Sequence, residues 1–172
     1  MRTGRVQEMV YSAVFAALIA VCAQIQIPLP PVPVNLALLA VHLASALLGA
    51  KAAVGAAGAY ALLGAMGLPV FSGMTGGPGV LFGPTGGFIL GYILSAAVTA
   101  WLLRGGRGFG RMCLAMACGT LCCYGLGTIW FMVLTGTGLI TALGWCVLPF
   151  LPGDAAKVLL AAAVARRMKR LG

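Results

Sequence analysis

Long apolar segments follow one another along almost the whole chain, and they constrain the fold more than any other feature of the sequence. Of the 172 residues, 62% are hydrophobic and only 8% are charged. A helix that spans a bilayer needs about 20 mostly apolar residues, and no loop between the apolar segments is long enough to form a separate domain. The sequence therefore predicts an all-α integral membrane protein that forms a single domain over residues 1–172.

Glycine and proline residues divide the apolar sequence into six predicted transmembrane helices. We expect these helices at residues 9–27, 35–50, 52–68, 84–103, 112–135 and 153–170. The first segment follows Arg2 and Arg5, as the apolar part of a signal peptide would, but it passes into a proline cluster without a small-residue cleavage site. We therefore expect a retained membrane helix.

The distribution of basic residues predicts how the helices cross the membrane. The chain has 11 Lys and Arg against two acids, a net charge of +9, but its basic residues form no aromatic-interleaved stripe of the kind that binds nucleic acid. With the N-terminus in the cytoplasm, all of them except Lys157 fall in inner segments: Arg2, Arg5, Lys51, Arg104, Arg107, Arg111, Arg166, Arg167, Lys169 and Arg170. The positive-inside rule therefore predicts two cytoplasmic termini.

The three predicted outer segments, residues 28–34, 67–83 and 136–152, contain no charged residue. The first is stiffened by four prolines, at positions 28, 30, 31 and 33. The second is rich in glycine and carries the apolar residues Val70, Phe71, Val80, Leu81 and Phe82. Because such side chains favour burial against protein or lipid, we expect this loop to pack over a cavity at the outer face.

Asp154 and Lys157 are the only charged residues outside the inner segments. We expect Asp154 to cap the last helix after a Pro-Gly break, with Lys157 on the same face. A charge within a membrane is costly unless it pairs, reaches water or meets a ligand. The two residues suit a small polar ligand that carries an acid, and the alternative is a structural ion pair that fixes the helix.

Five aromatic residues are predicted to line the cavity if they lie in the outer half of the membrane: Phe71, Phe82, Phe88, Tyr92 and Trp145. Aromatic walls with few polar groups describe many small-molecule sites. Each of these residues could equally occupy a membrane interface or a helix contact. We therefore rank them below the charged pair as candidates for ligand binding.

Other chemistry-bearing residues predict neither a metal site nor an enzyme. His42 has no second ligand near it in sequence, so we expect a packed or hydrogen-bonded helix residue. The six cysteines lack paired CxxC spacing and are expected to act as small apolar residues. An intramembrane hydrolase would need a nucleophile and base or two carboxylates, and no Walker motif is present, so a partner would have to hydrolyse ATP.

The first predicted helix carries two pairs of small residues at four-residue spacing, Ala13 with Ala17 and Ala16 with Ala20. Such pairs let a second helix approach closely. The pairs indicate either packing within the protein or a docking face for a partner.

Four stretches of the sequence resemble the BioY family, the biotin-specific substrate-binding (S) components of energy-coupling factor (ECF) transporters. They are PLPPVPV at 28–34, LLGAKAAVGAAGAYALLGAMGLPVFSG at 47–73, GPTGGFILGY at 83–92 and LPGDAAKVLLA at 151–161. The resemblance implies a six-helix S-component fold in a bacterial or archaeal cytoplasmic membrane, with no covalently bound cofactor. It also implies capture of biotin on the outer side, and association with a membrane coupling (T) subunit and two ATP-binding-cassette ATPases.

Carried over to this sequence, the resemblance implicates Asp154 and Lys157 in biotin binding, together with the loop of Gly83, Pro84, Thr85 and Gly86. It assigns docking of the coupling subunit to Ala13, Ala16, Ala17 and Ala20. Phe71 and Tyr92 complete the candidate binding residues. The family usually continues its Pro-Val-Pro with Thr-Leu-Gln, where this chain has Asn35, Leu36 and Ala37, so Asn35 is a candidate substitute for the missing Gln. The alternatives are an S component for thiamine or riboflavin and a structural membrane subunit.

Overall fold

The computed structural model describes residues 2–29 and 32–168. This part of the chain contains six main helices. They are α1 (Arg2–Gln24), α2 (Ala37–Leu47), α3 (Ala50–Ala65), α5 (Gly86–Leu102), α6 (Phe109–Thr135) and α8 (Leu151–Arg167). Each corresponds to one predicted helix, with ends that differ by a few residues. The largest difference is at the start of α1, because no proline interrupts the polar residues before the apolar segment and the helix extends through them.

The connections at one end of the molecule contain short elements that the sequence did not predict. Two antiparallel strands, β1 (Gln26–Ile27) and β2 (Val34–Asn35), pair Gln26 with Asn35 and Ile27 with Val34. Pro30 and Pro31, which belong to the predicted proline cluster, lie outside the described residues. The glycine-rich loop contains the single-turn helix α4 (Pro78–Leu81), and the last outer segment contains α7 (Leu139–Cys146).

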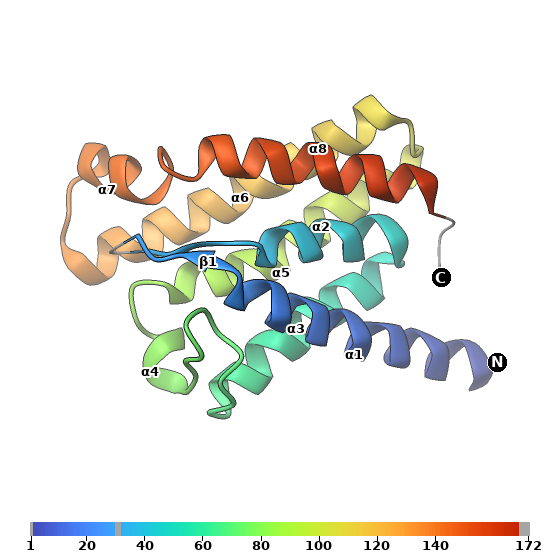
Figure 1. The fold of residues 1–172 in the computed structure, drawn as a ribbon, viewed down its shortest axis with the longest axis horizontal. Helices are drawn as coiled ribbons and strands as arrows, with labels where there is room; N and C mark the ends of the chain where they lie inside the picture. Colours follow the sequence, from blue (N-terminus) through green and yellow to red (C-terminus); the bar gives the residue numbers. More distant parts are fainter. Residues whose placement is uncertain (1, 30–31, 169–172) are drawn as a thin grey trace.

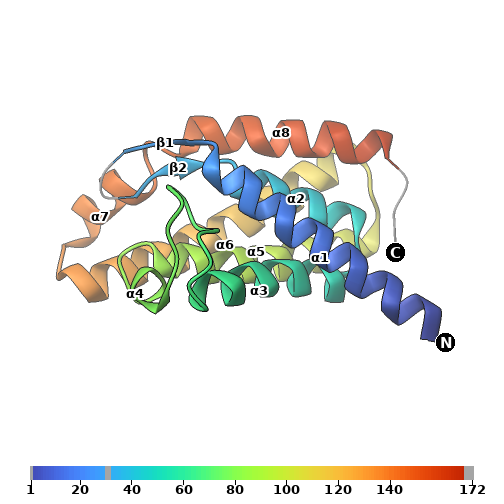
Figure 2. The same cartoon turned by 60° about the horizontal axis from the view of Figure 1, so that its bottom comes forward.

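The main helices lie side by side along the long axis of the molecule (Figure 1). The start of α1 and the end of α8 lie at one end, together with the turn from α2 to α3 and the 3₁₀ turn η1 (Leu103–Gly105) between α5 and α6. The hairpin, α4 and α7 lie at the opposite end, which Figure 2 shows from a second direction. The basic segments and the uncharged segments are therefore at opposite ends, although Lys169 and Arg170 lie outside the described residues.

Three of the described helices are long and apolar enough to cross a membrane: α1 from Arg5, α5 together with η1, and α6. The pair α7 and α8 meets the same criterion with a bend of 49° between them. The apolar helices α2 and α3 are shorter, at 11 and 16 residues. Exposed apolar side chains on the bundle, such as Val14, Leu121 and Leu159, are those expected of a surface that faces lipid.

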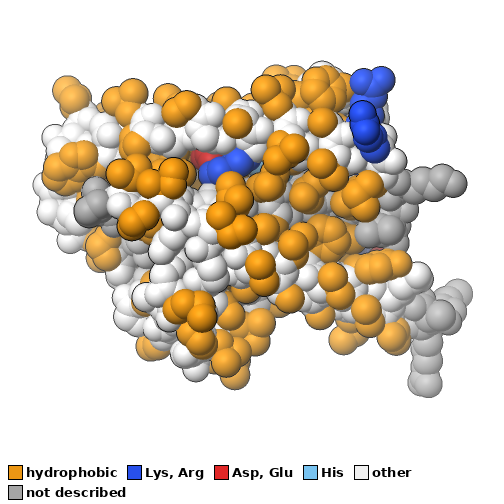
Figure 3. Space-filling view, in the orientation of Figure 1, with side chains coloured by type: hydrophobic (Ala, Val, Ile, Leu, Met, Phe, Trp, Pro, Cys, Tyr) orange, Lys and Arg blue, Asp and Glu red, His pale blue; other side chains and the backbone are white. Residues whose placement is uncertain are grey.

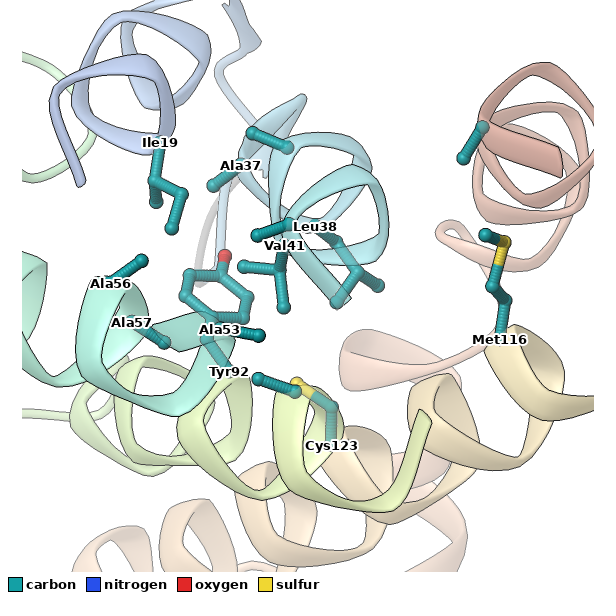
Figure 4. Packing of buried hydrophobic residues seen from close by; sticks show 14 of the residues in the cluster. Ile19, Ala37, Leu38, Val41, Ala53, Ala56, Ala57, Tyr92, Met116 and Cys123 are labelled. Carbon is teal, nitrogen blue, oxygen red and sulfur yellow. The ribbon is translucent and has the colours of Figure 1, made fainter. Parts of the chain in front are cut away.

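Close contacts between small side chains hold the bundle together. A Cβ atom added to Gly91 of α5 would lie 2.8 Å from the Sγ atom of Cys123 of α6, so the two helices approach closely at this point. Figure 4 shows side chains of α1, α2 and α3, among them Ile19 and Val41, around the ring of Tyr92. These contacts place Tyr92 at the centre of the packed helices.

His42 is a buried, hydrogen-bonded helix residue, as the sequence predicts. The His42 ring is fully buried, and its Nε2 atom lies 3.0 Å from Thr120 Oγ1 of α6. All six cysteines are free thiols. Within residues 2–29 and 32–168, no three His, Cys, Asp or Glu side chains cluster as metal ligands.

Candidate functional site

A cavity of about 310 Å³ lies near the end of the bundle that carries the hairpin and the glycine-rich loop. Its walls are mainly apolar and aromatic, with a small number of polar groups. The lining residues are Val32, Pro33, Asn35, Leu38, Tyr60, Phe71, Ser72, Thr75, Gly79, Val80, Gly83, Pro84, Thr85, Phe88, Ile89, Tyr92, Cys123, Tyr124, Phe150, Asp154 and Lys157. Ligand-binding pockets occupy roughly 300–1,000 Å³, so this cavity suits a small molecule.

Asp154 and Lys157 form a buried ion pair in the wall of this cavity. Their exposed fractions are 4% and 7%. The Lys157 ammonium donates a hydrogen bond of 2.5 Å to Asp154 Oδ1, and the Tyr124 hydroxyl of α6 donates one of 2.5 Å to Asp154 Oδ2. In Figure 3 a small red and blue spot is visible beneath the first turns of α8. Both carboxylate oxygens therefore have a partner without any ligand.

The prediction that Asp154 caps α8 is wrong. The helix begins at Leu151, and Pro152 occupies its first turn, where a missing N–H costs no helical hydrogen bond. The Pro-Gly sequence therefore starts the helix and does not precede it. Asp154 lies four residues beyond the N-cap residue, Phe150, and its backbone N–H already donates to Phe150 O at 2.8 Å.

Asn35 also lines the cavity and is the centre of a second set of hydrogen bonds. The Ala37 backbone N–H donates to Asn35 Oδ1 at 3.0 Å, which fixes the orientation of the amide. The Asn35 Nδ2 atom donates to Ser72 Oγ at 2.6 Å, and the Tyr92 hydroxyl donates to Asn35 Oδ1 at 3.3 Å. Asn35 thereby connects the end of the hairpin to the glycine-rich loop and to α5.

Gln24 and Phe71 anchor the glycine-rich loop across the bundle. The Gln24 side-chain amide, at the end of α1, donates to Val70 O and Phe71 O at 3.1 Å each, and its Oε1 atom accepts from the Met74 N–H at 2.9 Å. The Phe71 ring is buried, edge-on to Tyr60 of α3 with 5.5 Å between ring centroids. The loop is thus held closed from α1 and from α3.

Most of the predicted binding residues come together in this cavity. The lining includes Asp154, Lys157, Asn35, Phe71, Gly83, Pro84, Thr85 and Tyr92, as well as Phe88. Gly86 is not part of the wall: it is buried at the start of α5, where an added Cβ would overlap the Leu81 carbonyl.

Two of the five aromatic predictions are wrong. Phe82 is 66% exposed and Trp145 is 49% exposed, and neither lines the cavity. Trp145 packs edge-on against Phe131 instead, with ring centroids 6.3 Å apart. The backbone turns at α4 and α7 determine which of these side chains face inward, and the sequence predicted neither turn.

Sequence reasoning missed four main contributors to the wall, Tyr60, Cys123, Tyr124 and Phe150. Tyr124 is the most consequential because its hydroxyl touches the charged pair. The one available signal was a hydroxyl within an apolar segment, which must find a partner when it is buried.

The four alanines predicted to dock a partner do not share one exposed face. Ala13 and Ala17 are exposed and Ala20 is partly buried, whereas Ala16 is only 2% exposed. Ala16 packs inside the protein, and α1 contacts both α2 and α3. Of the two interpretations of the small-residue pairs, internal packing therefore holds for Ala16.

The chain is similar to known proteins over nearly its whole length. The model of the BioY family matches residues 1–172. The chain belongs to the BioY family. It is 37% identical over 165 residues to the biotin transporter BioY of Thermotoga maritima, covering 96% of this chain and 97% of that protein. It is also 35% identical over 165 residues to a probable biotin transporter BioY of Pyrococcus horikoshii, covering 96% and 98%.

The fold of this BioY-family chain agrees with a solved structure. The crystal structure of the S-component for biotin from an ECF-type ABC transporter matches it with a TM-score of 0.86 and 28% sequence identity. The match covers 97% of this chain and 93% of the other. The predicted S-component fold is therefore confirmed.

Proposed function

We propose that this chain is the biotin-binding S component of an ECF-type transporter, which captures biotin in the cavity described above for uptake across the cytoplasmic membrane. The observation that carries the proposal is the buried Asp154–Lys157 pair in the wall of a small aromatic cavity. Relatives of the same family also support the proposal, because proteins similar to this chain over nearly their whole length are named biotin transporters.

The chemistry of the cavity matches the chemistry of biotin. Biotin has a ureido ring with two N–H donors, an apolar thioether ring and chain, and a carboxylate. Asp154 accepts ureido N–H groups, since a carboxylate oxygen that already has one partner retains a second lone pair. Lys157 supplies the opposite charge that pairs with the carboxylate in an apolar wall. The aromatic walls contact the apolar rings and chain.

The remaining candidate residues have supporting roles in this proposal. Asn35, held by its backbone and side-chain contacts, takes the place of the Gln that the family usually has two residues later. Phe71 and Tyr92 contact the apolar part of biotin. Gly83, Pro84 and Thr85 form the wall at the start of α5, and Gly86 acts only through the backbone of that turn.

The proposal includes partners and an orientation. This protein delivers biotin and catalyses no reaction, so a membrane coupling subunit and two ATP-binding-cassette ATPases supply the energy. Their docking face on α1 contains Ala13, Ala17 and the partly buried Ala20. The clustering of basic segments at the end where α1 starts and α8 ends supports two cytoplasmic termini, with the cavity towards the outside.

Equilibrium binding to the purified protein in detergent tests the function. We expect biotin to bind tightly, and thiamine and riboflavin not to compete. The Asp154→Asn variant should lose at least tenfold in affinity, since a hydrogen bond to a charged group contributes about 1.5–3 kcal/mol. Tight binding of another vitamin without binding of biotin would disprove the proposal. Unchanged biotin affinity in a folded Asp154→Asn variant would show that the Asp154–Lys157 pair has a structural role and does not bind the ligand.

A further inference from the structure

A second hollow lies at the surface of the bundle, between α1 and α3, and we call it the α1–α3 groove. Its volume is about 450 Å³. The residues that line it are Arg5, Glu8, Met9, Ser12, Ala13, Lys51, Ala52, Gly55 and Ala59. The residues that line the groove and those that line the binding cavity do not overlap. The groove is therefore a distinct feature of the surface.

Short side chains on two parallel helices form the floor of the groove. The helices α1 and α3 pack side by side, and both start at the end of the bundle that carries the basic segments (Figure 1). The Ser12 hydroxyl lies 3.0 Å from the Ala52 carbonyl oxygen, so the two helices are close at this level. Gly55 is exposed and has no side chain, and Ala13 and Ala59 each add only a methyl group. These residues leave an apolar channel that a hydrocarbon chain can fill.

Three charged side chains lie at the mouth of the groove, near the starts of both helices. Arg5 and Glu8 are exposed in the first two turns of α1, and Lys51 is exposed at the second position of α3. Among the side chains that the structure describes, none forms a hydrogen bond or an ion pair with these three. The lining continues without further charge to Ala59, eight residues or about 12 Å along the helix beyond Lys51. One end of the groove is thus charged and the other is apolar.

This arrangement matches a phospholipid that lies along the helices. A phospholipid places its headgroup at the membrane surface and its acyl chains in the hydrocarbon core, and basic pockets between membrane helices bind such headgroups. Arg5 and Lys51 suit the phosphate, since both side chains donate charge-assisted hydrogen bonds to phosphate oxygens. The Glu8 carboxylate repels a headgroup that is only negative and attracts one that also carries an ammonium. The groove therefore favours a headgroup with both charges.

We propose that the α1–α3 groove binds one phosphatidylethanolamine molecule. Arg5 and Lys51 hold its phosphate, Glu8 accepts hydrogen bonds from its primary ammonium, and one acyl chain fills the apolar floor. A choline headgroup carries the same charges but has no N–H to donate to Glu8, and a glycerol headgroup has no ammonium. This lipid site is independent of the cavity and goes beyond the proposed function.

Lipid titrations of the delipidated protein in detergent, followed by native mass spectrometry, test the proposal. The probes are phosphatidylethanolamine, phosphatidylglycerol and phosphatidylcholine with identical acyl chains. We expect the wild type to bind the ethanolamine lipid about fivefold more tightly than the other two. Glu8→Gln should abolish this preference. Arg5→Gln and Lys51→Gln should each weaken all three lipids about fivefold, the effect of about 1 kcal/mol for one cation near a membrane surface.

Two further variants separate this site from general surface effects. Arg166→Gln is the matched control, because Arg166 is an exposed cation in the last turn of α8 and does not line the groove. It should bind all three lipids as the wild type does. Ala59→Leu fills part of the apolar floor, so it should weaken all three lipids and leave their order unchanged. Biotin affinity, measured in parallel, shows that each variant is folded.

Three results would overturn the proposal. Equal affinity of the wild type for the three lipids would exclude selection of the headgroup, and this measurement needs no variant. An ethanolamine preference that persists in Glu8→Gln would exclude recognition of the ammonium by Glu8. Equal losses in Arg5→Gln and Arg166→Gln would show that lipids respond to the overall charge of this end, and a groove that serves only to dock a protein would give this result or no lipid binding.

Discussion

At the scale of single residues, the main feature is a charged pair that is neutral as a unit. Removing one member of a buried pair leaves an uncompensated charge, whereas replacing both with neutral groups of similar volume does not. Asp154 and Lys157 meet this condition, since both are buried and the distance between their charged atoms is 2.5 Å. The pair therefore contributes to folding as well as to ligand binding, and the two contributions can be separated.

The first prediction concerns this separation. Lys157→Ala should lower the free energy of unfolding by about 3–5 kcal/mol, because it leaves the Asp154 carboxylate unpaired. The double variant Asp154→Asn and Lys157→Gln should be less destabilised, since no charge remains. Denaturation in detergent, followed by helical circular dichroism, measures both. If the double variant is as unstable as Lys157→Ala, the loss of charge balance is not the cause of the destabilisation.

Single-residue predictions from the sequence succeeded where a physical cost identified the residue. Asp154 and Lys157 were singled out because charge in a membrane requires a reason, and the structure places both in the cavity wall, while their role in binding stays a prediction. Tyr124 was missed because an isolated tyrosine in an apolar helix gives no information about its partner, which is 30 residues away in the sequence. Phe82 and Trp145 were misplaced because their direction depends on the local turns of α4 and α7.

At the scale of secondary-structure elements, α1 and the glycine-rich loop are joined by one side chain. Gln24 uses both its amide nitrogen and its amide oxygen on the loop backbone, at Val70, Phe71 and Met74. The same loop carries Phe71 into the cavity wall. A change in the position of α1 therefore acts directly on the loop that closes the cavity.

The second prediction follows from this connection. Gln24→Ala removes three hydrogen bonds to the loop, so the loop should open more often and biotin should dissociate several-fold faster. Stopped-flow or surface-based release of labelled biotin measures the rate. Gln7→Ala is the control, because Gln7 is exposed on the same helix and its side chain donates a hydrogen bond to Tyr11 of that helix, away from the loop. Equal release rates in the two variants would contradict a role for Gln24 in loop closure.

The third prediction concerns the contact between α5 and α6. Gly91→Ala should destabilise the protein by about 1–3 kcal/mol, the cost of overpacking, because the new methyl group would lie 2.8 Å from Cys123 Sγ and 3.1 Å from its backbone. Gly125→Ala is the matched control, since nothing lies within 4 Å of a Cβ at that position. Thermal unfolding of both variants in detergent tests the difference. Similar stabilities would show that the helices can move apart without cost.

The helices themselves were predictable, and the elements between them were not. Apolar length and Gly or Pro breaks gave six helices with ends within a few residues for α2, α3, α5, α6 and α8. The hairpin, α4 and α7 could not be predicted, because short elements depend on contacts with the rest of the fold, such as the pairing of Gln26 with Asn35. The helices α7 and α8 meet at a bend of 49°, at the short break between Cys146 and Leu151.

At the scale of the whole molecule, the two ends differ in chemistry. The end where α1 starts and α8 ends carries the basic segments, and the end with the hairpin, α4 and α7 contains no charged residue in its connections. Charge patterning in the sequence predicted this division, since the positive-inside rule needs no knowledge of packing. The extent of the domain over all 172 residues and the two cytoplasmic termini stay predictions.

The fourth prediction concerns assembly with the proposed coupling subunit. Ala17→Trp places a large side chain on the exposed face of α1 and should abolish co-purification with the native membrane partners, because small residues are needed for close helix approach. Leu160→Trp, on the exposed surface of α8, is the control and should leave assembly intact. Biotin affinity should be unchanged in both variants. Normal assembly of Ala17→Trp would exclude this face of α1 as the docking site.

The neutrality of the Asp154–Lys157 pair has an electrical consequence for uptake. A binding site with no net charge adds nothing to the work of moving across the membrane potential, so the electrical work belongs to the carboxylate of biotin alone. Moving one negative charge inward against an inside-negative potential costs about 2.3 kcal/mol per 100 mV. Under the proposed function, the empty binding site adds no electrical work of its own, and the energy supplied by ATP must cover both the concentration gradient and this electrical cost for every molecule of biotin delivered.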